Sequence, residues 1–376
     1  MKNFVTIFEK TENIHLIKDV GQIPYIMHKK FGYDATIVTV KNEKIYDYLE
    51  DEVKGLKMRF IPKVKFGSIS LSVIWYLLFH AKNIDVLHLF HHRERTYVYF
   101  WVYKLLNPSG VAYLKSDMGY KGLINHNGLL PKGRLKYKLR SWLFYKVIDK
   151  INIISIETKN SYDFLVLHYP QYKEKFLYLS NALNIERFYA LSPLKKYEEK
   201  ENIVLTVGRI GAPEKDNQML LDAVEKLDLE GWKVLFVGPI EPAFQKNIEA
   251  FYDKNPNLRG SVEFIGPIYE RQKLFDLYSC SKIFCLTSVE ESFGFVLIEA
   301  MAYGNYIVTT PISSAKDLTA DEKVGEIISD ADALSKTLEK RMKCEMERES
   351  EEAVRYAQAN FDWTIVLKKL DQRING

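Results

Sequence analysis

Two carboxylates, Glu291 and Glu299, stand eight residues apart in the stretch 288–304, S-V-E-E-S-F-G-F-V-L-I-E-A-M-A-Y-G. The apolar run 283–287 predicts a buried strand before them, and residues 295–303 predict a helix after a short polar turn. Because a helix rises about 1.5 Å per residue, the two carboxylates should lie roughly 12 Å apart along its axis. This distance is about the reach of a sugar nucleotide.

The start of this helix suits a pyrophosphate, because its unpaired N–H groups and the positive end of its dipole favour an anion. Glu291 would then accept hydrogen bonds from sugar hydroxyls and Glu299 from a ribose. An ordinary strand and helix with two solvated glutamates explains the same pattern, so the spacing alone leaves the function open. The residues expected at the pyrophosphate are Ser292, Phe293, Gly294 and Phe295.

A second group of candidate residues follows the apolar strand 203–207, in the segment 208–216, G-R-I-G-A-P-E-K-D. Ligands of parallel sheets gather at the carboxyl ends of strands, where this loop lies. Arg209 offers a planar fork and Lys215 a point charge, so the two could clamp a pyrophosphate. The alternative is a pair of solvated cations.

The elements that must position these residues form two series of alternating strands and helices. This alternation predicts two doubly wound α/β domains that face each other across a cleft. We expect an N-terminal domain over 1–190, a C-terminal domain over 191–355, and a closing helix over 356–376 that packs back on the first domain through Phe361 and Trp363. The charged run 195–201 predicts a linker. The expected strands are 4–8, 35–40, 86–90 and 111–114, then 203–207, 233–237, 262–265, 283–286 and 306–310.

The first strand lacks the G-x-G-x-x-G fingerprint, which disfavours a nicotinamide or flavin enzyme. Gly21 either lets the backbone approach a phosphate closely or is a plain turn glycine. His91 and His92 follow the strand 86–90 and either touch an acceptor or are ordinary loop histidines. No further ligand stands at a spacing that would complete a metal site.

Charge is unevenly divided along the 376 residues, although the net charge is only +4. Residues 1–190 hold 29 Lys and Arg against 17 Asp and Glu, a net of +12, and the remainder carries −8. The basic half is therefore the candidate for an anionic partner. No motif for nucleic-acid binding accompanies this charge.

The segment 129–150 mixes seven basic residues with aromatic and aliphatic ones and has one acid, Asp149. It predicts either contact with an anionic membrane surface or a helix with a buried apolar face and a solvated basic one. No apolar run approaches the ~20 residues of a membrane span, and the N-terminus lacks a signal-peptide layout, so we expect a cytoplasmic protein. Three cysteines without C-x-x-C spacing predict reduced, buried thiols.

Together these motifs resemble the retaining glycosyltransferases of family 4, the glycosyl transferases group 1, which have the GT-B fold. The resemblance rests on G-R-x5-K-D at 208–216, E-x7-E at 291–299 and E-A-M-A-x-G at 299–304. It is looser before residue 190, where 181–184 stands at a turn of the family, and 361–363 resembles the family's closing helix.

The resemblance implies that Arg209 and Lys215 hold the donor diphosphate, that Glu299 binds the ribose, and that Glu291 binds sugar hydroxyls. It implies transfer of a hexose or N-acetylhexosamine from a nucleoside-diphosphate sugar to a hydroxyl of a glycan or lipid-linked acceptor, with UDP as the expected nucleotide. It also implies that the domain 191–355 binds the nucleotide sugar and the domain 1–190 the acceptor. Neither a metal nor another cofactor is expected. The setting would be bacterial cell-surface polysaccharide synthesis, in the cytoplasm or at the inner face of the plasma membrane.

One departure from the family concerns a histidine that commonly follows a strand comparable to 111–114. Here the chain continues Lys115-Ser116-Asp117, so Ser116 or Asp117 takes that place and Asp117 becomes the candidate catalytic acid. We expect the acceptor region at His91, His92, Lys115 and Ser116. The alternatives are a GT-B epimerase or phosphorylase, or a catalytically weak binding subunit.

A D-x-D motif at 330–332 resembles the metal site of a different glycosyltransferase fold. It precedes a helical pattern here, so we interpret Asp330 as a helix cap.

Overall fold

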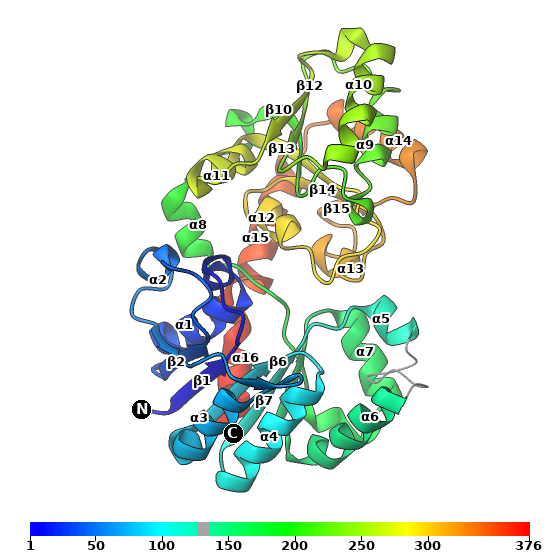
Figure 1. Cartoon of the computed structure of the whole chain (residues 1–376). Coiled ribbons are helices and arrows are strands. Elements are labelled where there is room, and N and C mark those ends of the chain that lie inside the picture. Colours follow the sequence, from blue (N-terminus) through cyan, green and yellow to red (C-terminus); the bar gives the residue numbers. More distant parts are fainter. Residues whose placement is uncertain (126–134) are drawn as a thin grey trace. The chain divides into compact units, whose positions relative to one another are not determined.

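The computed structural model describes residues 1–125 and 135–376, without side-chain detail for residues 135–140. The chain forms two compact units (Figure 1). Unit 1 comprises residues 1–182 and 363–376, and unit 2 comprises residues 183–362. Each unit is a parallel sheet covered by helices on both faces, as the alternating pattern predicts.

The sheet of unit 1 has the strand order β3-β2-β1-β6-β7-β8-β9, with every pair parallel. Chain order reverses between β1 and β6, which is the switch point of a doubly wound fold. The predicted strands of this unit are confirmed to within two residues at each end. Their bounds are β1 Asn3–Ile7, β2 Asp34–Thr39, β3 Lys57–Phe60, β6 Val86–Phe90, β7 Val111–Ser116, β8 Ile153–Ile156 and β9 Phe176–Tyr178.

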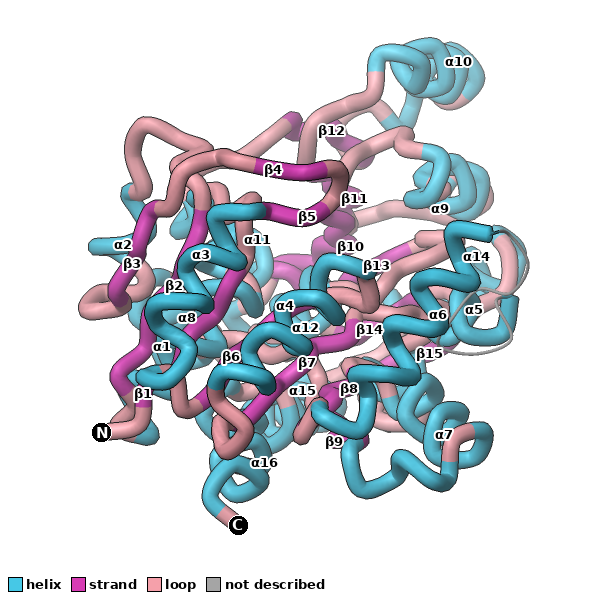
Figure 2. Tube along the Cα trace, turned by 60° about the horizontal axis from the view of Figure 1, so that its bottom comes forward, coloured by secondary structure: helices cyan, strands magenta, loops and turns pink. Residues whose placement is uncertain are grey.

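Alternate strand residues of unit 1 enter two separate cores. Phe4 and Val86 pack against α1 and α16, whereas their neighbours Val5 and Leu87 pack on the other face against α3, α4 and α6. Figure 1 shows α16 beside α1, and Figure 2 shows α3, α4 and α6 side by side over the sheet. The helices are α1 Asp19–Phe31, α2 Asp47–Asp51, α3 Leu71–His80, α4 Glu94–Leu106, α5 Tyr120–Asn125, α6 Leu135–Val147, α7 Lys159–His168 and α16 Trp363–Asn375, and a short antiparallel pair is β4 Lys65–Phe66 with β5 Ile69–Ser70.

Unit 2 repeats this plan with the strand order β12-β11-β10-β13-β14-β15 and a switch point between β10 and β13. Its predicted strands are confirmed to within two residues. The strands are β10 Glu201–Val207, β11 Lys233–Val237, β12 Val262–Gly266, β13 Ser281–Leu286, β14 Tyr306–Thr309 and β15 Gly325–Ile327. The helices are α8 Ile185–Leu191, α9 Asn217–Val224, α10 Gln245–Lys254, α11 Arg271–Cys280, α12 Phe295–Ala302, α13 Ala315–Leu318, α14 Ala331–Met342 and α15 Glu347–Asn360.

The boundaries between the units differ from those expected at 190/191 and 355/356. Ile185 and Phe188 of α8 are buried in a core of unit 2, which moves the first boundary to 182/183. The run expected to be a linker is packed as well, because Tyr197 is buried in the other core of this unit. At the second boundary the chain passes from α15 to α16: Phe361 stays in unit 2 and only Trp363 packs in unit 1.

The cysteines correct another expectation, because only Cys285 is buried. Cys280 is half-buried and Cys344 is exposed, and all three are free thiols. Among the helices of residues 1–125 and 135–376, none combines the length and the apolar character needed to cross a bilayer.

Candidate functional site

The two sequence motifs of unit 2 meet at the carboxyl edge of its sheet. They follow β10 and β13, which are neighbours in the sheet although about 80 residues separate them in the chain. Thr287 donates its hydroxyl to the carbonyl of Lys215 at 3.0 Å, and the amide of Val289 donates to the carbonyl of Glu214 at 2.9 Å. These bonds fix the loop 208–216 against the segment that carries Glu291.

Lys215 and Glu291 form an ion pair between Nζ and Oε1. Both side chains are mostly buried, with 19% and 16% of their surface exposed. Ser288 also donates its hydroxyl to Glu291 Oε1, at 2.9 Å, which holds the carboxylate in place. An ammonium group has three donors, so Lys215 can contact phosphate oxygens while it remains beside Glu291.

Backbone geometry shapes the loop that carries Lys215. Asp216 lies in the left-handed region at φ 41° and directly precedes α9. Gly238, at the end of β11, has φ 139°, and a Cβ there would lie 1.7 Å from the carbonyl oxygen of Gly208. The close approach of these two loops requires a glycine, and it sets the path of the chain towards Arg209.

The helix α12 begins after Gly294, which has φ 93° and therefore favours glycine. Phe293 is buried and its carbonyl accepts a hydrogen bond from Ser314, whereas Ser292 is exposed and Phe295 half-buried. The predicted turn and helix are confirmed. The backbone amides at the start of α12 thus follow Glu291 in the chain, directly after this turn.

Glu299 lies on α12 and accepts a hydrogen bond from the hydroxyl of Tyr278, at 2.9 Å. Burial and the Glu299 carboxylate raise the pKa of Tyr278 well above its ordinary value, so the phenol remains a donor. The partly exposed Glu299 carboxylate is thereby oriented by a neutral neighbour.

Arg209 differs from Lys215 in its surroundings. Its guanidinium pairs with Glu214, lies 3.7 Å from Glu241, and leaves 59% of the side chain exposed. Both cations occur on one loop, as predicted, but only Lys215 is held by a mostly buried partner.

The structure separates the residues expected to contact an acceptor in unit 1. His92, Lys115 and Ser116 are buried, with 1 to 2% exposure. His91 is partly exposed, has φ 64°, and pairs through Nδ1 with Asp117 Oδ2 at 2.7 Å. Burial alone would raise the pKa of Asp117, but its bond to His91 lowers it below the ordinary value. His91 and Asp117 are therefore the accessible members of this set.

Gly21 has a packing explanation. It lies in the first turns of α1, and a Cβ there would come within 2.3 Å of the carbonyl oxygen of Leu16. The protein's own backbone fills the space beside this glycine.

Sequence reasoning missed two carboxylates in unit 1, Glu157 and Asp19. Glu157 directly follows β8 and pairs with the buried Lys115, and Asp19, in the first turn of α1, lies 3.4 Å from the same ammonium. Burial alone would lower the pKa of Lys115, but the two carboxylates raise it above its ordinary value. A charged residue at the end of an apolar parallel strand was the signal available for Glu157.

The D-x-D motif forms a helix cap, as predicted. Asp330 accepts a hydrogen bond from the amide of Ala333 at 2.9 Å, and Asp332 pairs with Lys226. Bonds from Ser329 and from Ala333 lower the pKa of Asp330. Within the described residues, no group of three or more His, Cys, Asp and Glu side chains is arranged to hold a metal ion.

A cavity of about 490 Å³ also lies in unit 2, between residues 194–198 and α15. It is lined by no residue that follows the carboxyl end of a strand. Because ligands of doubly wound sheets bind at that edge, the Lys215–Glu291 region remains the candidate site.

Comparison with known proteins identifies unit 2. Residues 193–360 match the family model described as glycosyl transferases group 1. This match agrees with the resemblance to the glycosyl transferases group 1 that the motifs of unit 2 indicate.

The chain is also 26% identical over 202 residues to the phosphatidyl-myo-inositol mannosyltransferase of Mycobacterium leprae, with 51% of each chain covered. The chain thus spans about half the length of the curated relatives it matches.

Two solved structures share the fold over the whole chain. A glycosyltransferase from Rickettsia africae has a TM-score of 0.75 at 15% identity, covering 100% of this chain and 98% of that one. HepE of Anabaena, in complex with UDP and glucose, has a TM-score of 0.69 at 13% identity, with both chains covered completely. At such low identity the likeness concerns the fold alone, and it confirms the predicted GT-B class of two Rossmann-like domains.

Proposed function

We propose that this protein is a retaining glycosyltransferase of family 4 that binds a nucleoside-diphosphate sugar in unit 2. The observation that carries the proposal is the Lys215–Glu291 pair at the carboxyl edge of the sheet, directly before the N-terminus of α12. Lys215 and Arg209 would bind the diphosphate, Glu291 the sugar hydroxyls and Glu299 the ribose. The match to glycosyl transferases group 1 supports the same assignment.

In the proposed reaction, the bond between the anomeric carbon and the diphosphate oxygen breaks and a bond to the acceptor oxygen forms. The acceptor's proton passes to the departing diphosphate. Negative charge grows on the diphosphate as the bond breaks, so fixed cations and helix amides stabilise the transition state more than the ground state. We propose that these groups do so without a metal or another cofactor.

The donor is proposed to be a UDP-linked hexose or N-acetylhexosamine, and the acceptor a hydroxyl of a glycan or lipid-linked glycan in bacterial cell-surface polysaccharide synthesis. HepE, which shares the fold, was solved with UDP and glucose, and this supports the choice of base as a first test. The Mycobacterium leprae relative, named for phosphatidyl-myo-inositol, supports a lipid-linked acceptor.

Replacement of Lys215 by Ala tests the donor site. Loss of one donor to a developing negative charge typically costs about a hundred- to a thousandfold in rate, so transfer from a UDP-sugar should fall by that factor. The measurement is release of UDP in the presence of an envelope extract as acceptor. Thermal shift with UDP reports binding separately from turnover.

Lys226→Ala is the matched control, because Lys226 is an exposed lysine of unit 2 paired with Asp332, outside the site. Its rate should equal that of the wild-type protein. Equal rates for Lys215→Ala and the wild type would remove the donor-site assignment. UDP binding without transfer or hydrolysis of any donor would instead favour a binding subunit.

We further propose that unit 1 docks on an anionic membrane at the cytoplasmic face. The described part of 129–150, from residue 135 on, includes α6, whereas residues 129–134 lie outside the described residues. The described residues give α6 the buried apolar face of one alternative, because Phe144 and Val147 lie in the core. Trp142 and Tyr145 are 57% and 53% exposed, and this supports the proposed contact with a membrane.

Two neighbouring helices extend the same exposed face (Figure 2). Trp75 and Phe79 of α3 stack at 5.8 Å and are 60% and 70% exposed, and Trp101 of α4 is 47% exposed. α3 and α6 contain no acidic residue and α4 contains only Glu94. Exposed tryptophans beside lysines suit the interface of an anionic bilayer.

Flotation with vesicles of phosphatidylglycerol tests this docking face. Binding should weaken with salt, because salt screens the charges. It should also weaken on vesicles of phosphatidylcholine, because these lack the anionic lipid that attracts the basic residues. Trp75→Ala should weaken it, whereas Tyr269→Ala, an exposed aromatic of unit 2, should leave it unchanged. Salt-independent binding, or none, would contradict the proposal.

A further inference from the structure

Unit 1 contains a cavity of about 120 Å³ at the switch point of its sheet. Its walls come from the ends of β1 and β6 and from the first turns of α4. This crevice beyond the carboxyl ends of the strands is where doubly wound sheets bind ligands. A cavity needs about 10–15 Å³ to hold a single water, so this cavity admits a group of several heavy atoms.

Glu9, in the turn after β1, contributes a buried carboxylate to the cavity wall. Its side chain is only 5% exposed. Oε1 is buried and receives no hydrogen bond from the described residues, and the cations nearest to the carboxylate, Lys65 and Arg95, lie 4.0 Å and 3.7 Å away. Removal of a carboxylate from water without hydrogen-bond donors is costly, so this group is suited to donors that a ligand supplies.

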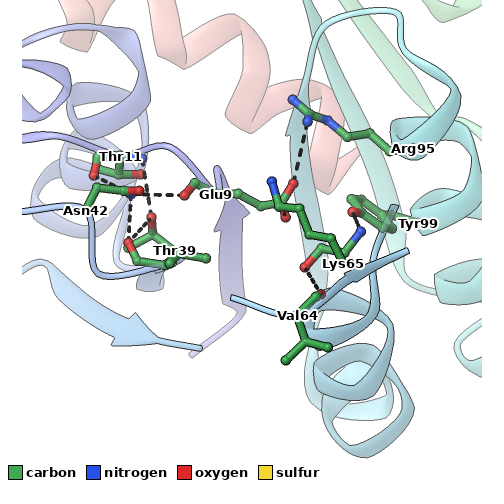
Figure 3. A network of polar contacts seen from close by, with 10 residues as sticks. Glu9, Thr11, Thr39, Asn42, Val64, Lys65, Arg95 and Tyr99 are labelled. Carbon is green, nitrogen blue, oxygen red and sulfur yellow. Dashed lines mark hydrogen bonds and ion pairs between the residues drawn. The ribbon is translucent and has the colours of Figure 1, made fainter. Parts of the chain in front are cut away.

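The turn that carries Glu9 is held rigidly by Asn42 (Figure 3). The Asn42 amide donates to the carbonyl oxygens of Glu9 and Thr11, both at 3.0 Å. The amide of Thr11 donates to the hydroxyl of Thr39, at 3.3 Å. The backbone of the turn is therefore fixed in advance, and the Glu9 side chain that it carries is buried, which is the arrangement expected of a binding group rather than of a solvated side chain.

Among the lining residues other than Glu9, those with a permanent charge are all cationic. Lys10, Arg93 and Arg95 line the cavity together with one acid, Glu9. Arg93 and Arg95 flank the N-terminus of α4, a helix of 13 residues, and a helix start favours an anion. The cavity thus offers one acceptor for hydroxyl donors and several partners for an anionic group.

His91, which pairs with Asp117, also lines this cavity. Asp117 orients the His91 ring through the 2.7 Å contact at Nδ1. A hydroxyl held by Glu9 would therefore lie in the cavity that His91 borders.

We propose that this cavity binds a phosphorylated polyol, with Glu9 accepting hydrogen bonds from its hydroxyls and Arg93 and Lys10 pairing with its phosphate. The polyol phosphate is either a free sugar phosphate or the headgroup of a lipid. Its role as the acceptor rests on the proposed function, whereas its binding in unit 1 does not.

Thermal shift and titration calorimetry of the full chain test the proposal. The probes are glucose 6-phosphate and glycerol 3-phosphate, their neutral counterparts glucose and glycerol, and dihexanoyl phosphatidylglycerol as the lipid source. At least one phosphorylated probe should raise the unfolding temperature and the neutral ones should not. A shift with the lipid alone assigns the cavity to a headgroup, and a shift with a soluble phosphate assigns it to a free polyol.

Glu9→Gln and Arg93→Gln should each weaken that binding at least about tenfold, because each loses a charge-assisted hydrogen bond. Glu50→Gln, which removes an exposed carboxylate of α2, is the matched control and should bind as the wild type does. Without a ligand, Glu9→Gln should change the unfolding temperature little, because the ion pairs that it removes are long, at 3.7 and 4.0 Å, and Oε1 accepts no hydrogen bond from the residues that the structure describes.

Three results would overturn the proposal: equal binding of neutral and phosphorylated probes, wild-type affinity in both variants, or no binding of any probe at concentrations on the order of 10 mM. A clear drop in the unfolding temperature of Glu9→Gln with unchanged binding would show a structural role instead. UDP binding and its loss in Lys215→Ala are read in the same assay. UDP binding without probe binding would contradict this inference alone, and probe binding without UDP binding would contradict the proposed donor site alone.

Discussion

Among the side chains that the structure describes, each unit has one lysine that is almost completely buried, and the two lysines differ in what surrounds them. Lys115 of unit 1 is 1% exposed and lies beside the carboxylates of Glu157 and Asp19. Lys200 of unit 2 is 6% exposed and donates only to the backbone carbonyls of Ser279, Ser281 and Tyr303, at 2.7 to 3.1 Å.

The surroundings give the two ammonium groups opposite pKa shifts. Carboxylates outweigh burial at Lys115 and raise its pKa, whereas burial lowers the pKa of Lys200 to about 7. Lys115 ends β7 at the carboxyl edge, where ligands bind, and Lys200 precedes β10 at the opposite edge. At the carboxyl edge, Lys115 is thus paired with carboxylates and keeps its charge. At the opposite edge, Lys200 donates hydrogen bonds to backbone carbonyls.

The largest effect on stability is expected for Lys115→Met. This substitution leaves the buried carboxylate of Glu157 and the partly exposed one of Asp19 without their cation, and breaking a buried pair in this way costs about 3–5 kcal/mol. Urea unfolding followed by tryptophan fluorescence measures it, because Trp75, Trp101, Trp142 and Trp363 belong to unit 1 and only Trp232 to unit 2.

The second substitution Glu157→Gln should recover part of this loss, since it removes the unpaired charge. Lys159→Met serves as a control: Lys159 pairs with Asp163 at the surface, with both side chains more than half exposed. Its unfolding should be nearly unchanged. Equal losses in the free energy of unfolding for Lys115→Met and Lys159→Met would contradict the expected difference between the buried and the exposed ion pair.

A smaller effect is expected for Lys200→Met at pH 7. The substitution removes a donor from three buried carbonyls but leaves no charge behind, so the free energy of unfolding should fall by about 1–3 kcal/mol. Hydrogen exchange of the amides of β10 and β13 reports it in unit 2. Lys196→Met, at a side chain that is 78% exposed, should change nothing.

The pH dependence of stability should separate the two lysines further. Between pH 7 and about 10.5 the unfolded chain keeps a proton on Lys200 that the folded chain has released, so stability contributed by this group rises with pH. One such proton gives a slope of at most about 1.4 kcal/mol per pH unit. The contribution of Lys115 has the opposite sign: it is complete below pH 10.5 and is lost only as pH rises through its raised pKa.

Hydrogen exchange of β10 and β13 at pH 7 and pH 9, corrected for intrinsic rates, checks this slope. The wild-type protein should gain stability over that interval relative to Lys200→Met. Parallel behaviour of the two proteins would mean that Lys200 keeps an ordinary pKa.

The smallest effect is expected for Asp330→Ala. Loss of the hydrogen bond to Ala333 removes a cap from α14, so the unfolding temperature should fall slightly. Sugar transfer should stay at the wild-type rate, in contrast to Lys215→Ala. A transfer rate that falls with Asp330→Ala would return the D-x-D motif to the active site.

Local patterns predicted much of unit 2. Apolar runs located all strands but the short β15, and loop chemistry placed Arg209 and Lys215 just before α9. The sequence did not reveal that Ile185, Phe188 and Tyr197 belong to the cores of unit 2, because a boundary depends on which core receives a side chain. The single closing helix expected over 356–376 likewise did not reveal the break between α15 and α16 at Phe361 and Asp362.

The amino-acid sequence by itself determined the class of fold and the charged residues that follow its strands, because both depend on neighbours along the chain. Only the tertiary structure decided which charges meet. In the two sheets β10 lies beside β13 and β1 beside β6, so strand order departs from chain order. That departure brings Lys215 to Glu291 in one unit, and in the other it encloses Glu9 between the ends of β1 and β6.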